Sequence, residues 1–114
     1  MNTIKTLAFV GDSLKHLRSF PAAVRQDIGF QLYKVQRGQQ PRDFKPMPSI
    51  GPGVQELRVW DECGTFRVVY TAQFQEYVFV LHSFQKKTMQ TSQSDIDLAK
   101  RRYRQVKEQQ HGKN

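Results

Sequence analysis

The chain has 114 residues, of which 38% are hydrophobic and 25% are charged, and its net charge is +8. This composition excludes a largely disordered protein, and the length suits a single domain, residues 1–114, with a core of its own. The excess of basic residues indicates a polyanionic partner, either nucleic acid or an acidic protein.

The chain offers few residues for metal or redox chemistry. Cys63 is the single cysteine, which excludes a disulfide framework and a thiolate metal cage. The three histidines, His16, His82 and His111, are scattered and have no ligand spacing, so we expect no metal and no other cofactor. The N-terminus does not resemble a secretory signal, and no apolar run approaches the length of a membrane span. We therefore expect a cytoplasmic protein without a membrane partner.

The first third of the chain predicts a strand followed by two helices. Residues 3–10 alternate loosely and indicate a short strand. Asp12 or Ser13 is suited to cap a helix, and Pro21 suits the first position of a second helix, where its missing N–H costs nothing. Apolar side chains of the second helix then form one stripe, made of Val24, Ile28, Leu32 and Val35. We expect an αα-hairpin from about residue 12 to residue 37.

The segment 39–53 holds four of the five prolines and two of the seven glycines. Proline removes hydrogen-bond donors and biases the residue before it away from helix, so the segment predicts a loop inside the domain. This loop contributes Lys45 to the basic residues of the chain.

Three strands are predicted after the loop. In the first, 54–61, Leu57 and Val59 alternate with Glu56, Arg58 and Trp60; in the second, 66–72, Phe66, Val68 and Tyr70 alternate with Arg67 and Val69. The third begins with the apolar run 77–81, which is typical of a strand buried on both faces.

A last helix is predicted from the capping residues Ser92 to Ser94 onward, and from residue 108 the polar tail is expected to fray. Its apolar face consists of Ile96, Ala99, Tyr103 and Val106. The predicted order is β-α-α-β-β-β-α, which indicates an α+β fold: a small antiparallel sheet with its helices packed on one face and the other face partly open.

Basic residues at the strand ends predict a phosphate-binding site. The third strand runs into Gln85-Lys86-Lys87, and two adjacent ammonium groups are too costly to bury in a core. We expect Lys86 and Lys87 to converge with Arg67, and with Arg58 on the neighbouring strand, onto one hollow that grips a phosphodiester. Trp60, Tyr70 and Phe84 are candidates for stacking on bases. The alternative is that these charges only solubilise an exposed face and that Tyr70 and Phe84 are core residues.

The same residues suggest RNA cleavage. RNA contains its own nucleophile, the 2′-hydroxyl, so a base, an acid and charge stabilisation at phosphorus suffice. Like charges around Lys86 and Lys87 favour a neutral lysine that acts as a base. His82 is a second candidate acid or base, although a histidine within a strand is more often a hydrogen-bonded structural residue.

The order and spacing of several short segments resemble the HigB-type, phage-derived branch of the RelE/ParE toxin superfamily. The segments are FPAAVR at 20–25, QLY at 31–33, RG at 37–38, ELR at 56–58, GTFRVVY at 64–70, LHSFQKKT at 81–88 and the stretch from Asp95 through Ala99-Lys100-Arg101. The resemblance covers about residues 5–105.

This resemblance implies a RelE-like microbial RNase fold and the toxin of a type II toxin–antitoxin system. Such toxins cleave mRNA in the ribosomal A site without a metal, and in this branch a helix-turn-helix antitoxin of the HigA type holds them inactive. By motif position, Arg67 would stabilise the scissile phosphate, Lys86 and Lys87 would contact phosphate or transfer protons, and Arg58 and Gln85 would contact RNA. Trp60 stands where some relatives have a lysine. The tyrosine that some relatives have after the basic pair is replaced by Met89-Gln90-Thr91.

Two other functions remain open at this point. The same fold serves ParE-like toxins, which inhibit DNA gyrase by protein contact, and a non-catalytic RNA-binding domain would show the same charges. We expect an acidic or amphipathic segment of the antitoxin to cover part of the basic surface.

Overall fold

The computed structural model describes residues 4–86 and 90–111. Lys87 and Met89, to which the sequence analysis refers, lie outside the described residues. The elements in chain order are β1 (Thr6–Phe9), α1 (Ser13–Arg18), α2 (Ala22–Gln36), β2 (Phe44–Pro46), β3 (Val54–Asp61), β4 (Gly64–Thr71), β5 (Tyr77–Lys86) and α3 (Gln93–His111). The order of the predicted elements is confirmed, and β2 is an addition.

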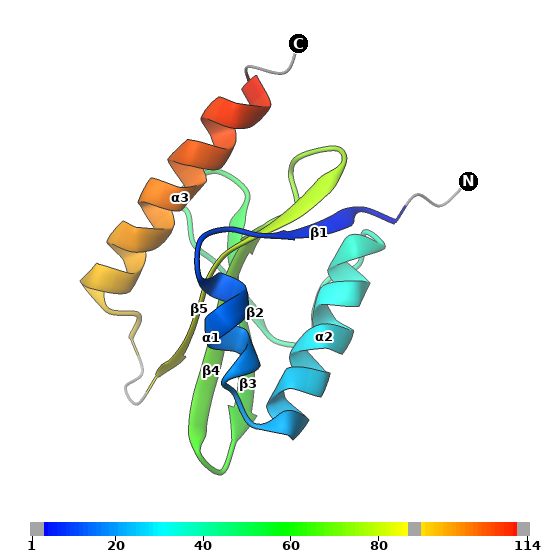
Figure 1. Ribbon diagram of the computed structural model, residues 1–114, viewed down its shortest axis with the longest axis vertical. Helices are drawn as coiled ribbons and strands as arrows, with labels where there is room; N and C mark the ends of the chain where they lie inside the picture. Colours follow the sequence, from blue (N-terminus) through cyan, green and yellow to red (C-terminus); the bar gives the residue numbers. More distant parts are fainter. Residues whose placement is uncertain (1–3, 87–89, 112–114) are drawn as a thin grey trace.

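The strands form one five-stranded sheet in the order β1-β5-β4-β3-β2 (Figure 1). The prediction of a purely antiparallel sheet is wrong in one pair, because β1 lies parallel to β5 while the other three pairs are antiparallel. Two helices and three strands separate β1 from β5 along the chain, so no hairpin fixes their relative direction. The short strand β2 was predicted as loop because of Pro46, which an edge strand tolerates.

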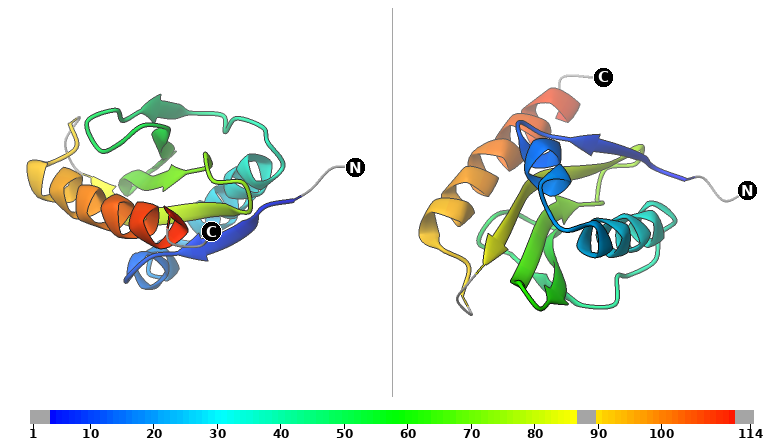
Figure 2. Two further views of the ribbon diagram at one scale, coloured as in Figure 1. Left: turned by 90° about the horizontal axis from the view of Figure 1, so that it is seen from above. Right: turned by 60° about the horizontal axis from the view of Figure 1, so that its bottom comes forward.

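Helices cover both faces of the sheet, whereas the sequence predicted helices on one face only. Figure 2 shows α1 and α2 on one side of the sheet and α3 on the other. The core is correspondingly split: Val24, Ile28 and Leu32 of α2 pack on one face, and Ala99, Tyr103 and Val106 of α3 pack on the other. The physical reason is that β5 carries apolar residues on both faces, such as Val78 and Val80 on one and Phe79 and Leu81 on the other, so the second face needs a cover as much as the first.

A β-bulge in β5 decides which residues face α3. Val69 pairs with His82 while Tyr70 pairs with Val80, so Leu81 is an extra residue between two register positions. Before the bulge the odd-numbered Phe79 packs on the α3 side, and after it the even-numbered residues do so. Lys86 therefore lies on the same face as Arg67, because its partner Thr65 is two residues from Arg67.

The helix ends differ in detail from the prediction. Asp12 occupies the position before α1, but its carboxylate makes no capping hydrogen bond, and Pro21 immediately precedes α2 instead of opening it. Ser92 does cap α3, because its Oγ accepts a hydrogen bond from the Asp95 N–H at 3.2 Å. The last helix extends to His111 and so includes residues 108–111 of the predicted frayed tail. No helix within the described residues combines the length and the apolar character that a membrane span requires.

Candidate functional site

Three basic side chains gather on the face of the sheet that α3 covers, here called the α3 face. Arg58 on β3 and Arg67 on β4 are direct cross-strand partners. Lys86 on β5 is a diagonal neighbour of Arg67, and such neighbours lie about 7–8 Å apart. The structure thus brings Arg58, Arg67 and Lys86 together from three strands, as the sequence predicted for these three.

Arg67 does not lie open in a hollow. Its Nη1 donates a hydrogen bond to Glu56 Oε1 at 2.5 Å, and the two side chains are only 3% and 0% exposed. The other carboxylate oxygen of Glu56 accepts a hydrogen bond from Thr91 Oγ1 at 2.7 Å. Sequence reasoning missed Glu56 as a partner, although the alternation of β3 already placed it on the same face as Arg58. The candidate site is therefore built on a buried ion pair.

Arg58 and Trp60 share one carboxylate from the loop between α2 and β2. The Nη2 and Nε atoms of Arg58 donate to Asp43 Oδ1 at 3.1 and 3.3 Å, and Trp60 Nε1 donates to Asp43 Oδ2 at 3.0 Å. Trp60 nevertheless remains 59% exposed, so its ring is available for stacking. Asp43 therefore holds the side chains of Arg58 and Trp60 in place beside Arg67.

Lys86 is buried, which corrects the expectation that the basic pair could not belong to the core. Lys86 is 6% exposed, and its Nζ has no hydrogen-bond partner among the described residues. The ammonium group contributes to lowering the pKa of Asp95, so a carboxylate lies within electrostatic reach. Burial is tolerated because that charge compensates the ammonium, but an unbonded buried donor still favours the arrival of an anion.

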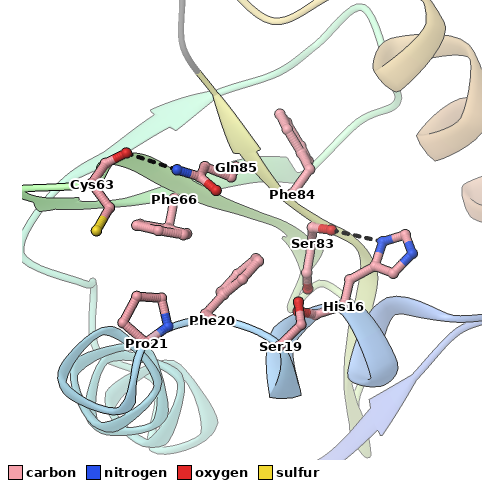
Figure 3. A pocket seen from close by; sticks show the side chains of 9 residues that line it. All are labelled: His16, Ser19, Phe20, Pro21, Cys63, Phe66, Ser83, Phe84 and Gln85. Carbon is pink, nitrogen blue, oxygen red and sulfur yellow. Dashed lines mark hydrogen bonds between the residues drawn. The ribbon is translucent and has the colours of Figure 1, made fainter.

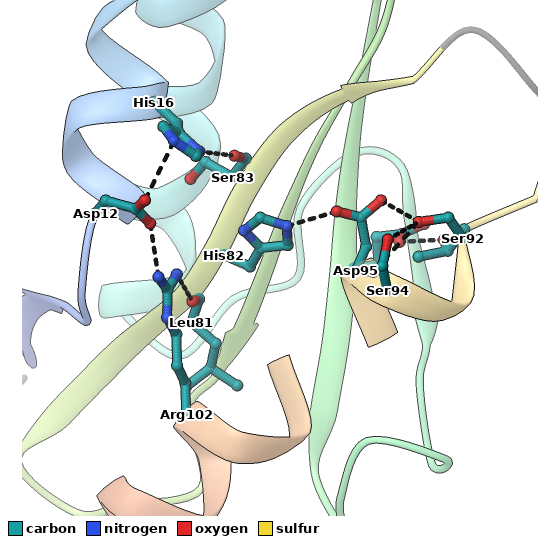
Figure 4. A network of polar contacts seen from close by, with 11 residues as sticks. Asp12, His16, Leu81, His82, Ser83, Ser92, Ser94, Asp95 and Arg102 are labelled. Carbon is teal, nitrogen blue, oxygen red and sulfur yellow. Dashed lines mark hydrogen bonds and ion pairs between the residues drawn. The ribbon is translucent and has the colours of Figure 1, made fainter. Parts of the chain in front are cut away.

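His82 links β5 to the start of α3 (Figure 4). Its Nε2 lies 2.7 Å from Asp95 Oδ1, its ring stacks on Phe84 at 4.7 Å between centroids, and it is 3% exposed. Because a carboxylate only accepts, Nε2 is the protonated nitrogen. Burial lowers the pKa of His82 and outweighs the opposing effect of Asp95, so the ring is neutral at pH 7. This geometry fits the structural alternative for His82.

The Asp95 carboxylate is held in its ionised form. Burial raises its pKa, but hydrogen bonds from Ser92 and His82 and nearby positive charge, including that of Lys86, outweigh burial, and the net pKa lies below the ordinary value. Figure 4 shows the same network continuing along β5, where Arg102 of α3 donates to Leu81 O at 2.9 Å and to Asp12 Oδ1 at 2.6 Å. These two hydrogen bonds fix α3 against β5 and against the segment that precedes α1.

Two predicted site residues lie on the opposite face of the sheet. Tyr70 is 1% exposed in the core beneath α2, where its hydroxyl donates to Gln55 Oε1 at 2.7 Å and burial raises its pKa. It cannot stack on a base in this position, so the core alternative is correct for Tyr70. Gln85 is exposed, and its Nε2 donates to Cys63 O at 2.8 Å.

Gln85 lines a cleft of 470 Å³ between β5 and the junction of α1 and α2 (Figure 3). This cleft lies on the opposite face of the sheet from Arg58, Arg67 and Lys86. Another cleft, of 310 Å³, has Lys45 and Thr91 in its lining, and Thr91 is the residue that hydrogen-bonds to Glu56. Lys45 is exposed on β2 directly opposite Glu56, so this second cleft opens beside the buried carboxylate.

Within the described ranges, 4–86 and 90–111, no group of three or more His, Cys, Asp or Glu side chains is arranged to hold a metal ion.

The architecture is that of the RelE class of small α+β proteins. The structure matches that of the E. coli toxin RelE, solved as a double mutant in the free state, with a TM-score of 0.62 and 16% sequence identity. The match covers 90% of this chain and 98% of RelE.

Residues 15–104 match the family described as Phage derived protein Gp49-like (DUF891), and the chain belongs to this family. A search of curated proteins finds no match. The predicted RelE-like α+β fold and the resemblance to the RelE/ParE superfamily are confirmed, while membership of the HigB branch stays a prediction.

Proposed function

We propose that this chain is the toxin of a type II toxin–antitoxin system and that it cleaves mRNA on the ribosome. Membership of the Gp49-like family and the fold of RelE support the toxin assignment. The observation that favours a nuclease is the direct cross-strand pairing of Arg58 with Arg67, next to Lys86.

Three cations on one small surface are costly for folding. Like charges directly opposite each other destabilise a sheet, and a buried ammonium without a hydrogen bond adds to that cost. Glu56 and Asp43 offset the arginines one by one, whereas Lys86 has no hydrogen-bonded carboxylate in the described structure. A polyanionic substrate would supply hydrogen-bond acceptors and further negative charge at Lys86, which Asp95 compensates only through space. A toxin that acted only by binding another protein would have less need of three cations that converge on one site.

The proposed chemistry is attack of the ribose 2′-oxygen on the adjacent phosphorus. The 2′-hydroxyl proton leaves to a base, the bond from phosphorus to the 5′-oxygen breaks, and that oxygen takes up a proton. The products are a 2′,3′-cyclic phosphate and a 5′-hydroxyl. Arg67 neutralises the charge that develops on the phosphoryl oxygens, which is the kind of interaction that contributes most to such reactions.

Glu56 serves as the positioning residue for Arg67, and Lys86 adds charge and is a candidate for proton transfer. His82 acts through Asp95 on the position of α3. Because Arg67 is 3% exposed, RNA reaches it only after Thr91 releases Glu56, from the side of the cleft that Lys45 lines. The exposed ring of Trp60 stacks on a base next to the cleaved bond.

The test is to map mRNA ends in cells shortly after induction of the chain. Arg67→Lys keeps a positive charge beside buried Glu56 but loses the planar fork, so it preserves the fold and removes the bidentate phosphate contact. Arg101→Lys, at an exposed position of α3, is the matched control. We expect new mRNA ends with the wild type and with the control, and few with Arg67→Lys. Intact mRNA with DNA damage would instead indicate a gyrase inhibitor, and intact mRNA and DNA with RNA binding would indicate a non-catalytic domain.

A further inference from the structure

The outer face of α2 is uncharged and, apart from Gln26, is formed by apolar, aromatic and glycine residues, although it points away from the core. It consists of Ala22, Ala23, Gln26, Gly29, Phe30 and Tyr33, all of which are exposed. Phe30 is 61% exposed and Tyr33 is 44% exposed. Figure 2 shows the sheet on one side of α2 and no described element against the other. An amphipathic surface helix normally presents polar residues there, so α2 has two apolar faces where its own fold uses one.

No contact among the described residues explains a glycine at position 29 of α2. Glycine inside a helix costs about 1 kcal/mol relative to alanine. A Cβ added at Gly29 would meet nothing within 4 Å, so no intramolecular contact requires its absence. Together with Ala22 and Ala23, Gly29 gives the helix a flat strip on which a second backbone can approach closely, since the distance between packed helices depends on side-chain size at the contact.

Basic residues border this strip. Arg25 lies on one flank, Lys34 Nζ lies 6.0 Å from the centroid of the Phe30 ring, and Arg37 Cζ lies 5.7 Å from the centroid of the Tyr33 ring. The nearest acidic residue of α2, Asp27, is engaged by Arg42 at 2.6 Å. The border is therefore positive.

The positive charge around the strip distinguishes between three kinds of partner that could bind the outer face of α2: a second copy of the chain, RNA, and an amphipathic helix of another protein. A second copy of the chain would bring the same cations face to face, and the net charge of +8 adds to that repulsion. RNA fits poorly, because cations already lie over both aromatic rings and the strip from Ala22 to Gly29 offers few hydrogen-bond donors. An amphipathic helix fits both features: its apolar stripe would pack on the strip, and flanking Asp or Glu residues would pair with the basic residues that border it.

We propose that the outer face of α2 is the docking surface for the cognate antitoxin, which binds it through a helix with an apolar stripe flanked by carboxylates. This inference rests on the toxin assignment made above and adds the location: the opposite side of the sheet from Arg67. Antitoxin contact at α2 and RNA cleavage at the α3 face are then separable by mutation.

The test uses the purified full-length chain and its purified full-length antitoxin. Phe30→Ser with Tyr33→Ser removes both aromatic anchors, and Ile4→Ser, at another exposed apolar residue, is the matched control. We expect the double variant to weaken antitoxin binding by at least about 30-fold, as the loss of a central aromatic anchor does, and the control to stay within threefold. Cleavage of ribosome-bound mRNA by the free double variant stays within threefold of the wild type.

Gly29→Ala supplies a second, independent signature. Alanine raises the melting temperature of the free chain because it is the better helix former, and it weakens antitoxin binding because it widens the contact. A merely structural role of Gly29 would not give these opposite signs. Charge reversal by Arg25→Glu should likewise weaken binding more at low salt than at high salt, and Arg101→Glu on α3 should not.

Unchanged antitoxin affinity in the Phe30/Tyr33 double variant overturns the proposal. So does a variant that keeps antitoxin affinity but loses binding to ribosomes, which would assign α2 to ribosomal RNA. Concentration-dependent self-association of the wild type that the double variant abolishes would assign the face to a second copy. A wild-type chain that binds antitoxin through α2 yet leaves mRNA intact refutes the nuclease proposal and leaves this one standing.

Discussion

The buried pair of Glu56 and Arg67 gives the sharpest quantitative prediction. Arg67→Ala leaves the Glu56 carboxylate, which is 0% exposed, without its guanidinium partner and with a hydrogen bond from Thr91 Oγ1 in the described part of the chain. Removing one partner of a buried ion pair costs about 3–5 kcal/mol, because the remaining charge is desolvated without compensation. Typical domains have only about 5–15 kcal/mol of stability in total. At about 4 °C per kcal/mol for a chain of this size, the melting temperature should fall by about 12–20 °C.

Replacing both charges should cost much less than replacing one. Glu56→Gln combined with Arg67→Gln leaves two neutral side chains that can still hydrogen-bond to each other, and exchange of a whole buried ion pair for neutral groups is often nearly neutral. We therefore expect a coupling energy of at least about 2 kcal/mol between the two positions. The assay is urea unfolding at pH 7 followed by circular dichroism, with the slope of the transition checked for constancy.

Arg101→Ala, at an exposed position of α3, is the control and should change stability by no more than about 0.5 kcal/mol. If Arg67→Ala loses less than about 1 kcal/mol, and if the losses of the single variants Glu56→Gln and Arg67→Gln add up to the loss of the double variant, the pair is not buried in solution as described. In that case the argument that Glu56 positions Arg67 fails as well.

Three further predictions concern other parts of the molecule. Trp60→Ala should weaken RNA binding by about 1–3 kcal/mol, the value of one stacked base, while Tyr70→Phe should leave it unchanged; fluorescence anisotropy with a short single-stranded RNA distinguishes the two. Burial lowers the pKa of His82, so the folded state binds fewer protons than the unfolded state as the pH falls below about 6.5. Stability should therefore fall from pH 6.5 to 5, and less steeply in His82→Gln; equal slopes in urea titrations would contradict this. Gly51→Ala places a Cβ 2.5 Å from Tyr103 Cε2 and should cost about 1–3 kcal/mol by forcing α3 away, which thermal melts would detect.

Local patterns in the sequence were enough for most of the fold. The stripe of Val24, Ile28 and Leu32 predicts α2, and the alternation around Leu57 and Val68 predicts β3 and β4 with the observed faces. These signals depend only on the periods of helix and strand, which a single segment contains.

The features that sequence reasoning missed depend on contacts between distant segments. The parallel direction of β1 is set by its docking on β5, and the position of α3 by the apolar second face of that strand. The bulge at Leu81 leaves no mark in the alternation, because the run from Tyr77 to Leu81 is apolar at every position. Without the bulge, the odd-numbered residues beyond it would face α3 in place of Lys86.

The candidate site was predicted only in part, because it too depends on contacts between segments that are distant in the sequence. Arg58, Arg67 and Lys86 could be placed near one another from strand order alone, but their partners could not. Glu56 contacts Arg67 from a neighbouring strand, and Asp43 reaches Arg58 from a loop, so both depend on register. Tyr70 was named as a stacking candidate because it lies near Arg67 in the sequence, although the alternation of β4 already placed it with Phe66 and Val68 on the face opposite Arg67. In the structure Gln55 accepts the hydrogen bond of its hydroxyl.

The chemistry proposed at Arg67 is tested most directly by single-turnover cleavage of mRNA bound to purified ribosomes, with analysis of the product ends. The wild type and Arg101→Lys should give a 2′,3′-cyclic phosphate and a 5′-hydroxyl at the same rate, and Arg67→Lys should be slower by about 100-fold or more, the usual effect of removing one charge-stabilising group. An Arg67→Lys protein that folds and cleaves at the wild-type rate would contradict the assignment of Arg67 to the scissile phosphate.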